Sequence, residues 1–179
     1  MKKLFVFVGD GGSGKSTLIA ELAGKYPDEF KRVVTCTSRP MRADEIDEKD
    51  YHFLPMSYFI NNPDLVLVKR TDNGNYYGTR KGDLQATTHH LLLTLRFVGL
   101  SKLISLGLSN VTVVRISVSE VLKTARMRQR GDTEEMIVQR LQFDATDKAN
   151  VNYEDFPIID LQASDALAEK VGHILRSTV

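Results

Sequence analysis

The chain alternates between short runs of apolar, β-branched and aromatic residues and longer segments in which apolar residues recur every three to four positions. The short runs are typical of strands buried on both faces, and the longer segments are typical of helices that pack one face on a sheet. We expect strands at residues 3–8, 30–37, 90–95, 111–116 and 156–159. We expect helices at residues 18–26, 99–105, 119–127, 133–147 and 163–177. This alternation indicates an α/β fold with a parallel sheet flanked by helices.

The stretch from residue 38 to residue 82 interrupts the alternation. It is rich in charged residues, Tyr, Asn and Asp, and it contains only short strand-like pieces at residues 51–54, 65–70 and 75–78. Such a stretch is too long for a simple connection in a compact α/β unit. We therefore expect one domain over residues 1–179, with its core at 1–37 and 83–179 and an inserted, mostly-β, substrate-binding subdomain at 38–82.

A glycine-rich loop joins the first predicted strand to the first predicted helix. It has the pattern G-x-x-x-x-G-K-[ST] of a phosphate-binding loop (P-loop), in the strand–loop–helix context that this motif requires, and consists of Gly9, Asp10, Gly11, Gly12, Ser13, Gly14, Lys15, Ser16 and Thr17. The glycines allow the backbone N–H groups to approach and surround a phosphate. Lys15 is suited to reach the β- and γ-phosphates, and the Ser16 hydroxyl is suited to ligate Mg²⁺. The motif predicts a P-loop NTPase-type fold that binds a nucleoside triphosphate, and ATP is the expected donor.

Composition and charge exclude several classes. Lys and Arg number 24 and Asp and Glu 23, so no general nucleic-acid or membrane surface is indicated. Cys36 is the only cysteine, which excludes an intrachain disulfide and a thiolate metal cluster, and its apolar neighbours predict a buried strand position. No run approaches the roughly 20 apolar residues of a membrane span, and the opening apolar run is too short for a signal peptide. We therefore expect a cytoplasmic protein.

A second group of candidate residues follows the predicted strand at 30–37. Arg39 and Arg42 lie three residues apart, and Tyr51 and Tyr77 supply two phenols further along the chain. Neighbouring hydroxyls come from Thr35, Ser38 and Thr79. Two guanidinium groups and two phenols form a suitable pocket for a dianionic phosphate monoester, because bidentate charge-assisted hydrogen bonds are strong and directional. The alternative is that the arginines are solvated loop charges and the tyrosines serve in packing.

These residues resemble the guanylate kinase family. Members share the P-loop, a T-T-R-x-P-R-x-G-E stretch followed by D-Y-x-F, a G-N-Y-Y-G-T/S stretch, and an arginine lid R-x-x-x-R-G-T-E. The corresponding stretches here are Thr37-Ser38-Arg39-Pro40-Met41-Arg42-Ala43-Asp44-Glu45, Asp50-Tyr51-His52-Phe53, Gly74-Asn75-Tyr76-Tyr77-Gly78-Thr79 and Arg126-Met127-Arg128-Gln129-Arg130-Gly131-Asp132-Thr133-Glu134. The resemblance spans nearly the whole chain, with its motifs in order.

The resemblance implies a kinase that moves the γ-phosphate of ATP to a nucleoside monophosphate, with Mg²⁺ as cofactor. Arg39, Arg42, Tyr51 and Tyr77 would hold the acceptor phosphate, with Thr35, Ser38, Glu45 and Thr79 nearby. Lid arginines Arg126 and Arg130, together with Arg140 on the helix after the lid, would close on the donor phosphates. Lys15, Arg42 and these three arginines would act by positioning and charge stabilisation, which dominate catalysis of phosphoryl transfer.

Two positions depart from the family pattern. Val68 stands where the family has a glutamate that binds guanine, and Arg96 stands where the second aspartate of D-x-D-x-Q-G also reads guanine. Asp44, Glu45 and Asp72 are nearby acids that could substitute. Leaving a buried hydrogen-bond donor unpaired costs about 1–3 kcal/mol, so loss of both acids weakens guanine recognition.

Three interpretations remain open. The first is an ATP-dependent guanylate kinase, acting on GMP or dGMP, that reads the base differently. The second is a kinase for another phosphorylated acceptor, such as ribose 1,5-bisphosphate. The third is a non-catalytic guanylate-kinase-like binding module, against which the intact Lys15, Ser16 and lid arginines argue.

Overall fold

The computed structural model describes residues 2–43, 45–71, 73–85, 88–108, 110–129, 131–148 and 156–178. The chain forms two compact units, one from Met1–Arg32 with Thr88–Val179 and the other from Val33–Thr87. The predicted insertion at 38–82 therefore lies within the second unit, which begins five residues earlier and ends five residues later. Within the described residues, no helix is long and apolar enough to cross a membrane.

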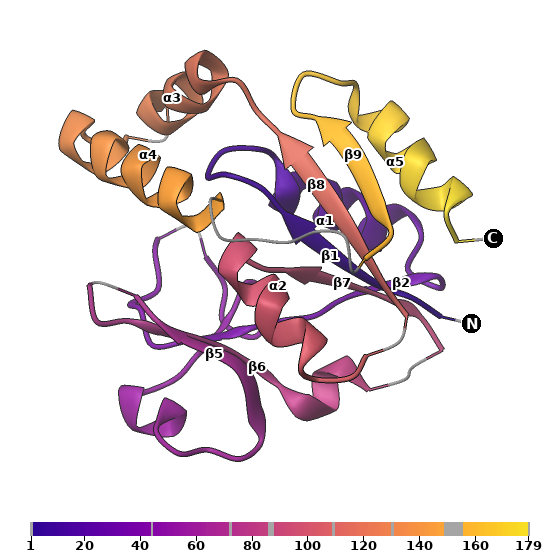
Figure 1. Cartoon of the computed structure of the whole chain (residues 1–179), viewed down its shortest axis with the longest axis horizontal. Helices are drawn as coiled ribbons and strands as arrows, with labels where there is room; N and C mark the ends of the chain where they lie inside the picture. The colour runs from indigo at the N-terminus through magenta and orange to yellow at the C-terminus, as the bar shows by residue number, and fades with distance from the viewer. Residues whose placement is uncertain are drawn as a thin grey trace. The chain divides into compact units, whose positions relative to one another are not determined.

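The first unit is built on a parallel sheet of five strands in the order β2-β7-β1-β8-β9 (Figure 1). The strands are β1 Leu4–Val8, β2 Phe30–Arg32, β7 His90–Thr94, β8 Val111–Ser117 and β9 Ile158–Gln162. Leu4 of β1 pairs with Leu91 on one side and with Val111 on the other, so β1 is the central strand. All five residues of β1 are buried, as expected for a strand covered on both faces.

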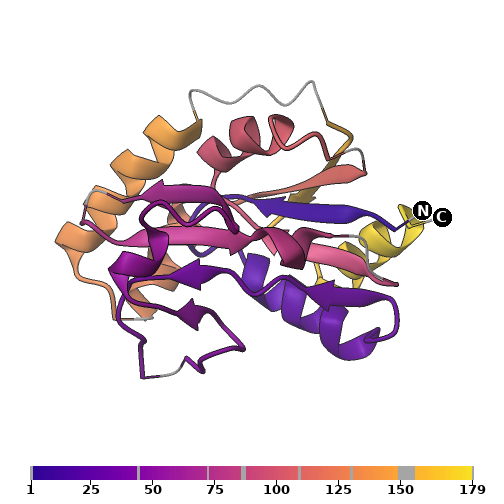
Figure 2. The same ribbon diagram turned by 90° about the horizontal axis from the view of Figure 1, so that it is seen from below.

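The described residues of this unit form five helices. They are α1 Lys15–Lys25, α2 Phe97–Ile104, α3 Glu120–Gln129, α4 Glu134–Lys148 and α5 Leu167–Arg176. Helices α1 and α2 lie on opposite faces of the sheet (Figure 2). Leu18, Ile19 and Leu22 of α1 pack with Val171 and Ile174 of α5 in one buried cluster, so α1 and α5 cover the same face. The predicted parallel sheet flanked by helices is confirmed.

The second unit contains a mixed sheet in the order β4-β3-β6-β5. The strands are β3 Cys36–Thr37, β4 His52–Phe53, β5 Leu65–Arg70 and β6 Tyr76–Arg80, and the 3₁₀ helices η1 Met56–Phe59 and η2 Lys81–Leu84 complete the unit. Its small core consists of Cys36, Phe59 and Leu65, against which Leu54, Tyr58, Val68 and Tyr76 pack. Cys36 is fully buried on β3, as its apolar neighbours predicted.

Several element boundaries differ from the sequence prediction, and two of the differences concern how the strands pair. The single strand expected at 30–37 is wrong, because Phe30 pairs with His90 in the parallel sheet whereas Cys36 pairs with His52 and Gly78 in the other sheet. The helix expected from Ala163 begins only at Leu167. The Ala163 N–H donates to the Ser117 carbonyl and so continues the pairing of β9 with β8.

Candidate functional site

The P-loop connects the carboxyl end of β1 to α1. Gly14 precedes α1 with φ 93°, a conformation that favours glycine over residues with a side chain. Gly9 is required for a different reason, since a Cβ there would lie 2.6 Å from the Ile116 carbonyl oxygen on the neighbouring strand. Ser13 is buried, while Ser16 and Thr17 are exposed in the first turn of the helix.

Lys15 folds back over its own loop. Its Nζ donates to the Gly9 carbonyl at 2.7 Å and to the Asp10 carbonyl at 2.8 Å, and it lies 3.3 Å from the Ser13 hydroxyl. Burial lowers the pKa of the Lys15 ammonium to about 8, although the carboxylates of Asp144 and Asp10 partly oppose this shift. The charge on Lys15 is therefore costly in the free loop, and a bound phosphate would stabilise it.

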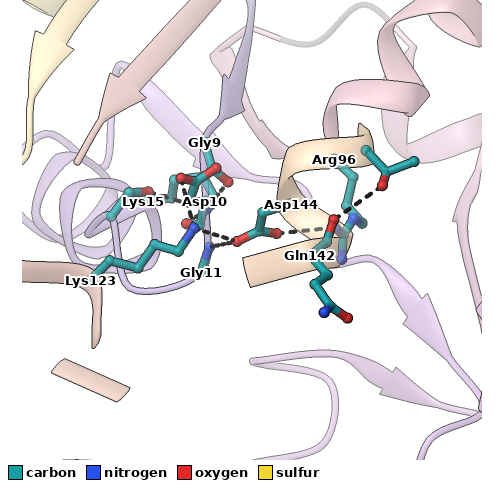
Figure 3. A network of polar contacts seen from close by, with 10 residues as sticks. Gly9, Asp10, Gly11, Lys15, Arg96, Lys123, Gln142 and Asp144 are labelled. Atoms are coloured by element: carbon teal, nitrogen blue, oxygen red, sulfur yellow. Dashed lines mark hydrogen bonds and ion pairs between the residues drawn. The ribbon is translucent and has the colours of Figure 1, made fainter. Parts of the chain in front are cut away.

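A buried chain of ion pairs lies beside the P-loop (Figure 3). The Lys123 ammonium, from α3, lies 3.0 Å from Asp10 Oδ2 and 3.2 Å from Asp144 Oδ2 on α4. Asp144 also accepts a 3.3 Å hydrogen bond from the Gly11 amide. The side chains of Lys123, Asp10 and Asp144 are only 5–7% exposed, so these ion pairs are shielded from solvent. They join the P-loop to both α3 and α4.

Lys123 and Asp144 were not predicted from the sequence, and Asp10 was predicted only as a variable position of the P-loop motif. A signal for Lys123 was present. It lies four residues before Met127, which is also buried, so the two share the inward face of α3. A charged residue on an inward helix face requires a partner. The partner could not be read from the chain, since Asp10 is 113 residues away from Lys123.

Two of the three arginines predicted to close on the donor phosphates lie against the P-loop. Arg126 Nη1 donates to the Gly12 carbonyl at 2.7 Å, and its Nη2 lies 3.5 Å from the Ala163 carbonyl. Arg140 is so near Gly11 that a Cβ there would lie 2.8 Å from Arg140 Nε. Arg130, the third of these arginines, lies outside the described residues. The structure therefore brings Lys15, Arg126 and Arg140 together around one loop.

Arg96 stands at the end of β7, immediately before α2. Its guanidinium lies 3.2 Å from Asp144 Oδ1 and 3.8 Å from the ring centroid of Phe143. The resemblance placed Arg96 with the acceptor-binding residues. In the structure its carboxylate and aromatic partners lie on α4, within the same unit as the P-loop.

The second unit brings four of the predicted acceptor-binding residues together. Arg39 forms a bidentate ion pair with Glu45, with N–O distances of 2.6 and 2.7 Å. The guanidinium also lies 5.2 Å from the ring centroid of Tyr51, and the ring of Tyr77 lies 6.1 Å from that of Tyr51. The hydrogen bond from Arg39 lowers the pKa of Glu45 and keeps this carboxyl ionised. Arg39 is thus fixed in place before any ligand binds.

The remaining predicted residues of this unit have different surroundings. Arg42 is exposed, and its backbone N–H donates to Glu45 at 2.9 Å. Thr79 is buried on β6, Ser38 Oγ accepts from the Tyr76 N–H at 2.8 Å, and the Thr35 carbonyl accepts from the His52 N–H at 2.9 Å. Val68 is partly buried and packs against the unit's apolar core. Asp44 and Asp72 lie outside the described residues.

Comparison with known proteins agrees with this arrangement. The family model for guanylate kinase matches residues 1–177. A guanylate kinase of Carboxydothermus hydrogenoformans is 31% identical over 164 residues, covering 88% of this chain and 79% of the relative. A guanylate kinase of Paraburkholderia xenovorans is 30% identical over 173 residues, covering 93% of this chain and 76% of the relative. The crystal structure of guanylate kinase from Anaplasma phagocytophilum superposes with a TM-score of 0.68 at 20% identity, covering 99% of this chain and 84% of that one.

A P-loop at the end of the central strand, with two arginine-bearing helices against it, is the arrangement of a P-loop kinase that acts on nucleoside monophosphates. More specifically, the chain belongs to the guanylate kinase family.

Proposed function

We propose that this chain transfers the γ-phosphate of ATP to the phosphate of GMP or dGMP, giving ADP and a nucleoside diphosphate. The observation that carries the proposal is the cluster of Lys15, Arg126 and Arg140 around a P-loop in a member of this family. In the reaction an acceptor phosphate oxygen forms a bond to the γ-phosphorus, while the bond from that phosphorus to the β-phosphate bridging oxygen breaks. Positive groups around the transferring phosphoryl group stabilise the charge that spreads over its oxygens.

The acceptor phosphate would bind to the second unit. The Arg39–Glu45 pair orients one guanidinium, and its remaining N–H groups, the Arg42 guanidinium and the phenols of Tyr51 and Tyr77 supply donors for a dianion. The network that holds Arg39 reduces the entropy lost when the phosphate binds.

Mg²⁺ is the proposed cofactor. Ser16 presents an exposed hydroxyl in the first turn of α1, directly after Lys15. Among the described residues, no group of three or more His, Cys, Asp or Glu side chains could hold a metal unaided. This suits a Mg²⁺ ion that arrives with the triphosphate and takes most ligands from phosphate and water. Bound Mg²⁺ would neutralise charge on the β- and γ-phosphates.

Two observations favour a second candidate, a kinase for another phosphorylated acceptor such as ribose 1,5-bisphosphate. Val68 packs in an apolar core, and Arg96 is paired with Asp144. Neither position supplies the carboxylate that would accept hydrogen bonds from guanine N1–H and its exocyclic amine. Both candidates transfer the γ-phosphate of ATP to a phosphorylated acceptor, and they differ only in the acceptor.

An ADP-release assay across GMP, dGMP, the other nucleoside monophosphates and ribose 1,5-bisphosphate tests the proposal. We expect turnover with GMP or dGMP. Turnover with the sugar bisphosphate but not with GMP would replace the first candidate by the second. ATP binding without turnover on any acceptor would instead support a non-catalytic module.

Replacing Arg42 with alanine is expected to raise the KM for the acceptor about tenfold and to lower kcat, while the KM for ATP changes little. The reason is the loss of one charge-assisted hydrogen bond to the acceptor phosphate, worth roughly 1.5–3 kcal/mol. Steady-state kinetics with each substrate varied in turn would measure this. Lys49→Ala, which removes an exposed cation from the same unit, is the matched control. Equal effects of the two substitutions would remove Arg42 from the site.

A further inference from the structure

The mixed sheet of the second unit has one face that carries Tyr77. Tyr77 is directly opposite Thr37 on β3 and directly opposite Lys69 on β5. Residues opposite one another on neighbouring antiparallel strands point to the same face, with Cβ atoms about 4.5–5.5 Å apart. Thr37, Tyr77 and Lys69 therefore form a row across three strands (β5 and β6 are labelled in Figure 1).

Val68 lies on the other face. A Cβ built on Gly78 would lie 3.3 Å from Val68 Cγ2 and 3.6 Å from the Phe59 ring, and Gly78 alternates with Tyr77 along β6. Val68 also packs against the cluster that contains Phe59. The apolar core of the unit thus occupies the face of the sheet opposite Tyr77.

A bulge in β5 produces this arrangement. Val66 pairs with Thr79, and Lys69 pairs with Tyr77. Two residues of β5, Leu67 and Val68, therefore lie opposite a single residue of β6, Gly78. Leu67 has φ 55°, which is uncommon for a residue with a side chain and marks the site of the irregularity. One extra residue changes which side chains face each way. Here it leaves Val68 in the core and Lys69 beside Tyr77.

We propose that Lys69 is the specificity-determining residue of the acceptor site, and that it binds a hydrogen-bond-accepting or anionic group of the acceptor next to its phosphate. This rests on the proposed function, in which Tyr77 binds that phosphate. An ammonium has three donors and no acceptor. It therefore cannot take the hydrogen bonds that a carboxylate would take from guanine N–H groups. It can bind the O6 carbonyl of a purine or a second phosphate.

The charges on this face support the assignment. Lys69 adds a cation next to Tyr77, and it is only partly exposed, so its interaction with a ligand is incompletely screened by solvent. A hydrogen-bond donor at this position would distinguish phosphorylated substrates by a chemical group other than the phosphate.

Binding affinities of the wild type, Lys69→Met and Arg70→Met would test the proposal. Arg70 is the matched control, because it is a neighbouring exposed cation opposite Tyr76, on the other face of the sheet. Isothermal titration would use GMP, IMP, AMP, ribose 5-phosphate and ribose 1,5-bisphosphate. We expect Lys69→Met to weaken the tightest-binding acceptor about tenfold or more, as for loss of a charge-assisted hydrogen bond. Ribose 5-phosphate should change less than about twofold, and Arg70→Met should change every Kd by less than about twofold.

The ligands also distinguish the group that Lys69 binds. Similar wild-type affinities for GMP and IMP, both well above AMP, would identify the O6 carbonyl, and preference for ribose 1,5-bisphosphate over ribose 5-phosphate would identify a second phosphate. If Lys69→Met loses the same affinity for ribose 5-phosphate as for the tightest-binding acceptor, or loses no affinity for either, the assignment of Lys69 is overturned. Turnover is measured separately from binding. A selective loss of affinity in Lys69→Met, without phosphoryl transfer by the wild type, would refute the proposed function but support the assignment of Lys69.

Discussion

Replacing Lys15 with alanine is expected to reduce phosphoryl transfer by about a thousandfold or more, while the fold persists. The ammonium lies over the loop that would hold the donor phosphates, and it is desolvated there. A positive group that contacts a transferring phosphoryl group in such surroundings contributes on the order of 10³ or more to the rate.

The fold should tolerate the change, because Lys15 contributes little net stability. Its three contacts to the loop are partly offset by the cost of burying its charge, the same cost that lowers its pKa to about 8. Single-turnover kinetics, together with thermal unfolding, would measure both properties. Lys25→Ala is the control, since Lys25 lies in the last turn of the same helix and forms an exposed pair with Glu21. Wild-type transfer in Lys15→Ala would refute the role assigned to the P-loop.

The sheet and the P-loop could be predicted because each depends on adjacent residues. Five buried residues in a row form β1, and the nine residues after it contain a complete motif. The break between β2 and β3 could not be predicted in this way. Residues 30–37 are hydrophobic enough to be one strand. In the structure β2 pairs with β7 in the first sheet and β3 pairs with β6 in the second, and these partners are distant in the sequence.

The orientation and the partners of several residues in the candidate site also could not be predicted from the sequence. Sequence spacing identified position 68, but a bulge at Leu67 decides that Val68 faces the core and Lys69 faces Tyr77. A one-residue irregularity of this kind has no signature in hydrophobic periodicity. Arg96 stands where the family reads guanine, and the identity of its carboxylate partner, Asp144, could not be read from the chain because the two residues are 48 positions apart. The roles of the site residues in catalysis stay predictions.

Replacing Lys123 with methionine should lower the free energy of unfolding by about 3–5 kcal/mol. Methionine keeps most of the side-chain volume but removes the ammonium that lies between the carboxylates of Asp10 and Asp144. Breaking a buried ion pair by removing one partner is strongly destabilising, because the remaining charge stays in a poorly solvated environment. Chemical denaturation would measure the loss.

Arg128→Met on the same helix is the matched control. Arg128 pairs with Glu134 at 2.6 Å, and both side chains are more than half exposed. Exposed ion pairs contribute about 0–1 kcal/mol, so this variant should unfold nearly as the wild type does. Equal losses for the two variants would show that the pairs of Lys123 contribute no more than a surface pair.

Rescue separates charge from packing in the Lys123 variant. If the loss comes from uncompensated carboxylates, then adding Asp10→Asn and Asp144→Asn to Lys123→Met should recover at least about half of it, because the amides are neutral and similar in size. The amide oxygen that Asp144→Asn introduces could still accept the Gly11 N–H that the Asp144 carboxylate now accepts. Asp144→Asn also removes the ion pair with Arg96, and Asp144→Asn alone measures that effect. If the triple variant is no more stable than Lys123→Met after this effect is subtracted, the loss comes from packing of the lysine side chain against the loop. Recovery would instead establish that α3, which carries Arg126, and α4, which carries Arg140, are held at the P-loop by charge.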